Sequence, residues 1–181
     1  MGKIAVVIGP SGVGKSHLVK ALLDAHRDKA SILCSYTTRP PRRGEVNGED
    51  YCFVSQAEID SLDLLERVVY AGNTYGTPRV IFDNAVAADA DFVALIAMNV
   101  DGARLIKKEY GDDVVLFLLT MPFDVRRALL ERRDGVEAAA RRLANEDPEP
   151  RPSDAPFDFV LPNNGSQWAK IYDVVDAALF S

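Results

Sequence analysis

Hydrophobic residues follow two different spacings along the chain. Five short stretches are almost continuously apolar and rich in Val, Ile and Leu, which is typical of strands that are buried on both faces. They lie at residues 3–8, 30–35, 91–98, 113–119 and 157–161. The longer segments between them place apolar residues near the helical repeat. These segments lie at residues 15–26, 78–90, 101–109, 122–133, 136–146 and 165–179.

The alternation of these strands and helices predicts an α/β fold with a parallel, five-stranded sheet flanked by helices. One segment departs from the alternation. Residues 35–77 are rich in Arg, Gly and Pro and hold only short β-like pieces, such as "DYCFVS" and "ERVVYAG". We expect them to form a small inserted lobe after the second strand, with residues 1–34 and 78–181 forming the core.

The stretch "IGPSGVGKSHL" joins the first predicted strand to the first predicted helix. Its spacing of Gly9, Gly14, Lys15 and Ser16 is the pattern of a P-loop, in which backbone N–H groups and a helix N-terminus surround a phosphate. Lys15 is expected to reach the β- and γ-phosphates of a nucleotide, and the Ser16 hydroxyl to ligate Mg²⁺. The residues predicted to bind this nucleotide are Gly9, Ser11, Gly12, Val13, Gly14, Lys15, Ser16 and His17. By itself, the His17 side chain is typical of a solvated first-turn residue.

Composition narrows the class of protein. The chain has 181 residues, 48% of them hydrophobic, which suits one globular core with small insertions. Its formal net charge of −6 disfavours a broad nucleic-acid surface, and its apolar runs are too short to cross a bilayer. We expect a cytoplasmic protein without a signal peptide, a membrane partner or a nucleic-acid partner. The two cysteines, Cys34 and Cys52, lack metal-ligand spacing and are expected to be reduced.

The inserted lobe opens with the segment "SYTTRPPRRGEVNGEDYCFVS". Its three arginines, Arg39, Arg42 and Arg43, could form a solvated turn, because the acids that follow balance their charge. The alternative is a second phosphate site, since Pro40 and Pro41 stiffen the backbone and arginine suits bidentate phosphate contact. Two phosphate sites in one chain suggest phosphoryl transfer from one nucleotide to another.

Four segments together resemble the guanylate kinases, in the same order and at similar separations. They are "GPSGVGKS", the arginine segment, "LLERVVYAGNTYGTP" and "FDFVLPNNG". The resemblance covers nearly the whole chain, and its arginine segment is far more specific than the P-loop. It implies a P-loop nucleotide kinase fold with a GMP-binding lobe at residues 35–77 and a helical lid at residues 124–147.

The resemblance also assigns roles within the inserted lobe. The residues that it implies for the acceptor's phosphate are Ser35, Arg39, Arg42, Tyr51 and Tyr75. Glu66 and Thr77 would read the base, because a carboxylate can accept both the N1–H and the amino group of guanine, whereas adenine has no N1–H. Arg43 has no clear counterpart and is expected to be solvated.

The lid segment, residues 124–147, carries six arginines. Such a cluster is commonly a solvated helix face, but in a kinase it can close over the transferring phosphates. The resemblance favours Arg133 and Arg142 as catalytic residues, together with Lys15. Each of these two arginines has an arginine neighbour, so the choice within each pair stays open at this point.

The third core strand departs from the family pattern. The family has Asp-Ile-Asp followed by Val-Gln-Gly, whereas this chain has Ala97, Asn99 and Asp101 where two acids and the glutamine are usual. An acid here helps to hold Mg²⁺ or its waters. We expect Asn99 to replace a metal-supporting acid, so that the site holds Mg²⁺ with one negative charge fewer. Alternatively, Asp101 supplies the missing charge, or the acids matter only for the geometry of the lobe.

The resemblance implies transfer of a phosphoryl group from ATP to GMP, and also to dGMP, with Mg²⁺ bound to ATP. No general base is required, because the acceptor phosphate has a second pKa of about 6 and is already a nucleophile at neutral pH. Two alternatives remain at this point: a non-catalytic binding module of the same fold, and a kinase of that fold with another phosphorylated acceptor. The sequence leaves the oligomeric state open.

Overall fold

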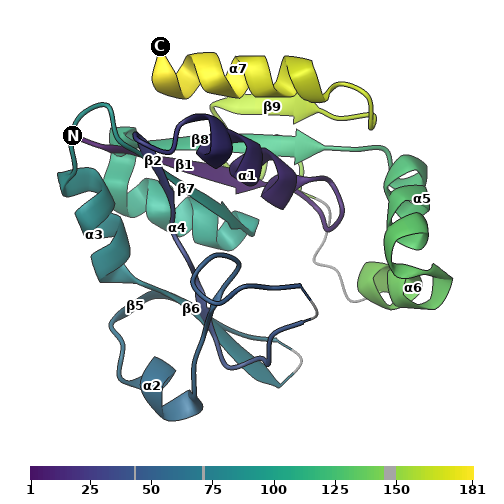
Figure 1. Cartoon of the computed structure of the whole chain (residues 1–181), viewed down its shortest axis with the longest axis horizontal. Coiled ribbons are helices and arrows are strands. Elements are labelled where there is room, and N and C mark those ends of the chain that lie inside the picture. Colours follow the sequence, from purple (N-terminus) through teal and green to yellow (C-terminus); the bar gives the residue numbers. More distant parts are fainter. Residues whose placement is uncertain (43, 71, 145–149) are drawn as a thin grey trace.

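The computed structural model describes residues 1–42, 44–70, 72–144 and 150–181. Its central sheet has five strands in the order β2-β7-β1-β8-β9, and every pairing in it is parallel (Figure 1). These strands are β1 (Lys3–Ile8), β2 (Ala30–Ile32), β7 (Val93–Met98), β8 (Val114–Thr120) and β9 (Phe159–Pro162). The predicted parallel five-stranded sheet is confirmed. The second strand is shorter than predicted, because the chain leaves the sheet after Ile32 on its way to the inserted lobe.

Helices cover both faces of this sheet (Figure 1). Side chains of α1 (Lys15–Ala25) and α7 (Trp168–Phe180) form one apolar cluster, and side chains of α3 (Arg79–Ala87) and α4 (Val100–Tyr110) form another. The strand β1 contributes to both, because successive side chains point to opposite faces. Ala5 and Val7 belong to the first cluster. Burial on both faces accounts for the unbroken apolar runs.

The inserted lobe contains a second sheet, of four strands in the order β4-β3-β6-β5. Its elements are β3 (Tyr36–Thr37), β4 (Cys52–Phe53), helix α2 (Gln56–Asp60), β5 (Leu64–Tyr70) and β6 (Asn73–Pro78). The pieces "DYCFVS" and "ERVVYAG" thus become β4 and β5. Only β3 and β4 pair in parallel, whereas β6 runs antiparallel to both of its neighbours. Arg43, which is expected to be solvated, lies outside the described residues.

Two further helices, α5 (Phe123–Asp134) and α6 (Val136–Ala144), project beyond the end of the sheet (Figure 1). They meet at Gly135, whose φ of +84° is a conformation that glycine adopts readily. The predicted lid and its second helix continue to residues 147 and 146, and residues 145–149 lie outside the described part of the chain. A short 3₁₀ helix, Gly111–Asp113, joins α4 to β8.

Candidate active site

The P-loop connects β1 to α1 and is enclosed by large side chains. A Cβ atom on Gly12 would lie 2.8 Å from Leu130 of α5, and one on Gly14 would lie 2.3 Å from the ring of Trp168. Glycine is therefore required at both positions for space, in addition to their positive φ angles. Contacts from α5 and α7 thus fix the shape of the loop from two sides.

Two buried polar side chains also hold the P-loop, and neither was assigned a role from the sequence. Arg126, which is 2% exposed, donates from Nη1 to the Ser11 carbonyl at 3.2 Å. Asn163, which is 1% exposed, donates from Nδ2 to the Val13 carbonyl at 3.0 Å. Asn163 lies within the family-like segment "FDFVLPNNG", but nothing in the spacing of the lid arginines distinguishes Arg126 as the one that packs inward.

Lys15 folds back over its own loop, donating from Nζ to the carbonyls of Gly9 at 2.7 Å and Pro10 at 3.1 Å. The next two side chains, Ser16 and His17, are exposed on the first turn of α1. The His17 ring meets the edge of Trp168, with 4.6 Å between the ring centroids. The loop thus presents an ammonium and a hydroxyl at the carboxyl end of β1, where a parallel sheet commonly binds ligands.

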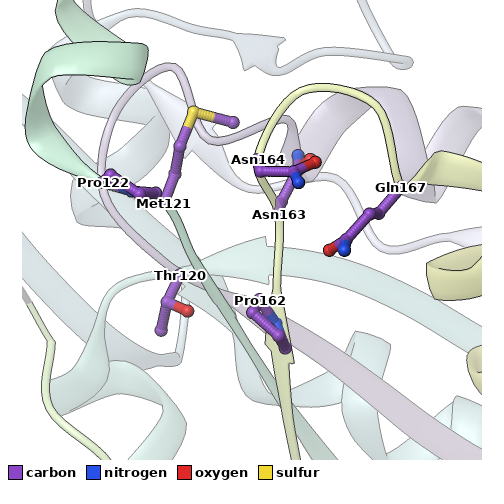
Figure 2. Close-up of a pocket in the computed structure, with 7 residues that line it drawn as sticks. All are labelled: Thr120, Met121, Pro122, Pro162, Asn163, Asn164 and Gln167. Atoms are coloured by element: carbon purple, nitrogen blue, oxygen red, sulfur yellow. The ribbon is translucent and has the colours of Figure 1, made fainter.

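A pocket of about 500 Å³ adjoins the P-loop (Figure 2). It lies between the end of β8 and the loop that follows β9, and Asn163 belongs both to its wall and to the P-loop contact described above. Its lining residues are Thr120, Met121, Pro122, Pro162, Asn163, Asn164 and Gln167. Apolar surface with a few amide groups and no charged side chain suits a flat, uncharged ring that carries hydrogen-bonding edges.

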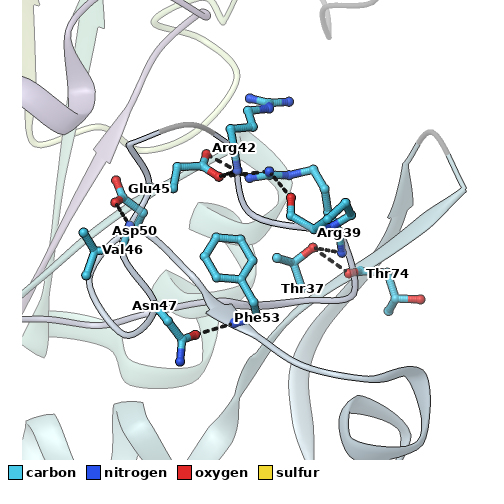
Figure 3. Close-up of polar contacts among 10 residues, drawn as sticks. Thr37, Arg39, Arg42, Glu45, Val46, Asn47, Asp50, Phe53 and Thr74 are labelled. Atoms are coloured by element: carbon cyan, nitrogen blue, oxygen red, sulfur yellow. Dashed lines mark hydrogen bonds and ion pairs between the residues drawn. The ribbon is translucent and has the colours of Figure 1, made fainter.

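Arg39 is the centre of the inserted lobe's polar site (Figure 3). It is 9% exposed and donates from Nη1 and Nη2 to the two carboxylate oxygens of Glu45, each at 3.0 Å. Its guanidinium carbon lies 5.5 Å from the centroid of the Tyr51 ring, and the centroids of the Tyr51 and Tyr75 rings are 6.0 Å apart. The fold therefore brings Arg39, Tyr51 and Tyr75 together, and adds Glu45, which the sequence analysis treated only as a balancing charge.

Arg42 and Glu45 complete this cluster. Burial opposes ionisation of Glu45, but hydrogen bonds from the Arg39 fork and from the Arg42 backbone amide outweigh it and lower the pKa of the carboxyl group. The guanidinium of Arg42 is exposed and points away from Glu45 (Figure 3). The cluster thus offers two arginine side chains to a ligand. Arg39 is held in place by Glu45, whereas Arg42 is free to reorient.

The predicted base-reading residues occupy the neighbouring part of the lobe. Glu66 pairs with Thr77 across β5 and β6, and the Thr77 hydroxyl is 2.9 Å from that of Ser35. Ser35 therefore lies with the base-reading pair, although the resemblance assigned it to the phosphate. The Glu66 carboxylate rests against Gly102 of α4. Burial, and secondarily the charge of Asp101, raise the pKa of Glu66.

The end of β7 holds the residues that depart from the family pattern. Ala97 is exposed and pairs with Val7, one residue before the end of β1, so it lies close to the P-loop. Asn99 instead caps α4, its side chain accepting a hydrogen bond from the Gly102 backbone N–H at 2.9 Å. Asp101 pairs with Arg104 at 3.0 Å on the surface, which gives no support to its role as a replacement metal ligand.

Three lid arginines near the junction of α5 and α6 have different partners. Arg133 donates from Nε and Nη2 to the two oxygens of Asp134, both at 2.8 Å, and Nη1 of Arg142 lies 3.6 Å from the same carboxylate. Arg141 instead pairs with Glu137 on the exposed face of α6. Within the pair of neighbours on α6, Arg142 is therefore the one that faces the junction of the two helices. Its role and that of Arg133 stay predictions.

Comparison with known proteins is consistent with this arrangement. The family model described as "Guanylate kinase" matches residues 1–180. The chain belongs to the guanylate kinase family. A relative named guanylate kinase from Nostoc sp. is 36% identical over 99% of this chain and 90% of its own length. Another of that name, from Bordetella pertussis, is 42% identical over 78% of this chain and 67% of its own length.

Solved structures support the same family. The crystal structure of guanylate kinase from Anaplasma phagocytophilum superposes with a TM-score of 0.68 at 25% identity, covering 99% of this chain and 87% of that one. A gluconokinase from Sinorhizobium meliloti, with a TM-score of 0.51 and 13% identity, shares the fold alone. None of the helices in the described ranges has the length and hydrophobicity that a membrane span requires.

Proposed function

We propose that the protein transfers the γ-phosphoryl group of ATP to GMP, and also to dGMP, forming ADP and the nucleoside diphosphate. The observation that carries this proposal is the presence of a P-loop and a separate cluster of Arg39, Tyr51 and Tyr75 in a chain of the guanylate kinase family. A kinase that joins two nucleotides needs both sites.

The acceptor's phosphate would bind to Arg39 and Arg42, with Tyr51 and Tyr75 donating hydroxyl hydrogen bonds. Glu45 and the Pro40 carbonyl accept hydrogen bonds from three of the five N–H donors of Arg39, which leaves Nε–H and one Nη2 hydrogen for a phosphate. The carboxylate fixes the orientation of the fork before the ligand arrives, which reduces the entropy lost on binding.

Guanine would be read by Glu66, Ser35 and Thr77. The ionised carboxylate accepts the N1–H and the amino group, while the paired hydroxyls of Ser35 and Thr77 offer a donor to the purine ring. Adenine carries no hydrogen on N1, so the Glu66 carboxylate would lose a hydrogen-bond partner although it is partly buried. Such mismatches discriminate by factors of about 10⁴.

ATP, the phosphoryl donor, would bind at the P-loop, outside the inserted lobe. Lys15 would exchange the carbonyls of Gly9 and Pro10 for the β- and γ-phosphates, which are stronger acceptors because they are charged. The pocket beside Asn163 would hold the adenine ring, since its volume and amide-bearing wall suit an uncharged purine. His17 and the remaining loop residues would contact the phosphates through their backbone N–H groups.

The residues of the chain fit a magnesium ion that arrives with the nucleotide. Mg²⁺ retains several waters and is usually held by few protein ligands together with substrate phosphates. Ser16 offers an exposed hydroxyl at the start of α1, and the described residues contain no group of three or more His, Cys, Asp or Glu side chains that could hold a metal by themselves. When bound, the ion neutralises charge on the transferring phosphates.

Catalysis would rest on positioning and on positive charge. ATP would be held at the P-loop and GMP in the inserted lobe. Lys15 and the lid residues Arg133 and Arg142 would surround the γ-phosphoryl group as it moves from one nucleotide to the other. Closure of the lid excludes water, which protects ATP from hydrolysis and strengthens each of these contacts. The two free cysteines suit a reducing compartment, and we place the reaction in the cytoplasm.

A panel of phosphorylated acceptors tests the proposal. ADP release from ATP and Mg²⁺ is measured with GMP, dGMP, AMP, CMP, UMP and a sugar phosphate in turn. We expect turnover with GMP and dGMP and little with the others. ATP binding without turnover of any acceptor would support a binding module instead, and turnover of another acceptor alone would support a different kinase.

A further inference from the structure

We propose that Asp134 is the positioning residue of the lid, and that its carboxylate holds Arg133 and Arg142 in place for phosphoryl transfer. The inference rests on the proposed function, because it concerns how the two arginines of that reaction are oriented. It starts from the convergence of both guanidinium groups, one from α5 and one from α6, on one carboxylate at the helix junction.

The contacts with Asp134 leave donors of both arginines available. Arg133 uses Nε and one hydrogen of Nη2, so its Nη1 group and the remaining Nη2 hydrogen can still form a fork toward a phosphate. Arg142 approaches with Nη1 alone, at 3.6 Å. The carboxylate can therefore fix the plane of one guanidinium and the position of the other while both keep hydrogen bonds for a substrate.

The position of Asp134 separates it from the other lid acids. Its side chain is 21% exposed, whereas those of Glu131, Asp124 and Glu137 are 38%, 86% and 93% exposed and make longer contacts with Arg127 and Arg141. An ion pair with such high exposure contributes little order. A bidentate pair with partial burial fixes geometry as well as charge.

The arginines around Asp134 favour its ionised form. The Arg133 hydrogen bond, together with the charges of Arg142 and Arg42, outweighs burial and lowers the pKa of the carboxyl group. Arg42 belongs to the inserted lobe, whereas Arg133 and Arg142 belong to the lid helices.

Helix electrostatics give no other reason for an acid at this place. Asp134 is the last residue of α5, where the helix dipole disfavours negative charge. Its neutral isostere removes this unfavourable interaction together with the favourable ion pairs to Arg133 and Arg142, so Tm is measured for each variant. This separates a loss of stability from a loss of positioning.

The test compares Asp134→Asn with Glu137→Gln, which removes a carboxylate from the exposed lid pair with Arg141. Activity is measured with saturating ATP, Mg²⁺ and varied GMP, well below each variant's Tm. We expect Asp134→Asn to lower kcat by about tenfold or more, because misplaced catalytic groups cost rate steeply. The KM values should stay within about threefold, since the lid contacts form mainly in the transition state.

Further outcomes decide between the alternatives. Glu137→Gln should retain wild-type kcat, and Asp134→Glu, which keeps the charge, should recover part of the lost rate. An unchanged kcat in Asp134→Asn, or a raised kcat with a lower KM, would overturn the inference, and the latter would make Asp134 a competitor of phosphate for the arginines. If Arg133→Ala and Arg142→Ala lower kcat while Asp134→Asn does not, the proposed function stands and the positioning role alone fails.

Discussion

Glu66 and Gly102 are packed so closely that a Cβ atom on Gly102 would lie 2.9 Å from the carboxylate carbon and from each carboxylate oxygen. Gly102 lies in the first turn of α4, in an ordinary helical conformation that any residue could adopt. Space for the Glu66 side chain, and not backbone freedom, is therefore the reason for glycine at this position. The contact joins the inserted lobe to the core at the point where the base of the acceptor would lie.

Gly102→Ala should separate stability from acceptor recognition. Alanine is favoured over glycine in a helix by about 1 kcal/mol, so Tm should be kept or raised if Glu66 moves aside. The displaced carboxylate should raise the KM for GMP by about tenfold or more, the cost of losing a charge-assisted hydrogen bond. The KM for ATP should stay unchanged. Lys108→Ala, an exposed change on the same helix, is the control, and an unaltered KM for GMP would contradict the role of the contact.

The raised pKa of Glu66 predicts a pH dependence of acceptor use. Only the ionised carboxylate accepts both guanine donors, so kcat/KM for GMP should fall as pH decreases through this pKa, at a higher pH than for an ordinary glutamate. Asp101→Asn removes the charge that contributes to the shift and should move the fall to lower pH. The titration of GMP itself is common to both proteins and cancels in the comparison.

A matched control for this profile is Asp112→Asn, which removes an exposed acid beyond the far end of α4. Its pH profile should superpose on that of the wild type. If Asp101→Asn and Asp112→Asn give the same profile, the charge of Asp101 does not act on Glu66.

Arg39→Ala should weaken acceptor binding specifically. The change removes a predicted phosphate contact and leaves Glu45 without its bidentate partner, so the KM for GMP should rise by about tenfold or more. ATP affinity should be nearly intact, because Arg39 lies in the inserted lobe, where we propose that GMP binds. The control is Arg67→Ala, which removes an exposed arginine paired with Asp60 in the same lobe. Equal GMP kinetics in the two variants would remove Arg39 from the phosphate site.

Ala97 and Asn99, at the end of β7, stand where the family has acids. The structure predicts that restoring an acid at each position has a different effect on the use of Mg²⁺. Ala97→Asp would place a carboxylate beside the P-loop and should lower the half-saturating concentration of Mg²⁺. Asn99→Asp should change it less, because the side chain caps α4 and aspartate is an equally good cap. A magnesium titration at fixed, saturating ATP and GMP compares both variants with the wild type. A larger response at Asn99 would reverse this assignment in favour of the sequence-based expectation.

The sequence predicted those parts of the molecule that depend on local pattern. The core strands are apolar on both faces, and the P-loop follows from the spacing of Gly9, Gly14 and Lys15. Strands β3 and β4 have two residues each, too few for any periodicity to emerge. Their pairing is set by the fold of the whole lobe, and so is the meeting of Ser35 with Thr77.

The lid shows the same limit for side chains. Its arginines are equivalent in composition and spacing, yet Arg126 is buried against the P-loop, Arg141 is exposed and Arg133 meets Arg142 at one carboxylate. Which arginine takes which place depends on the angle between α5 and α6 at Gly135 and on the packing of Leu130 against Gly12. Neither relationship can be read from residues that are neighbours in the chain.

The packing of Trp168 on Gly14 gives the protein a built-in optical reporter. This indole is the one tryptophan of the chain, and it touches both the P-loop and the ring of His17. Rearrangement of the loop around phosphates would change the surroundings of this single fluorophore, so its emission should follow ATP binding without any added label. GMP alone, bound in the inserted lobe, should leave the signal almost unchanged, and the order in which the two nucleotides bind can then be followed in real time.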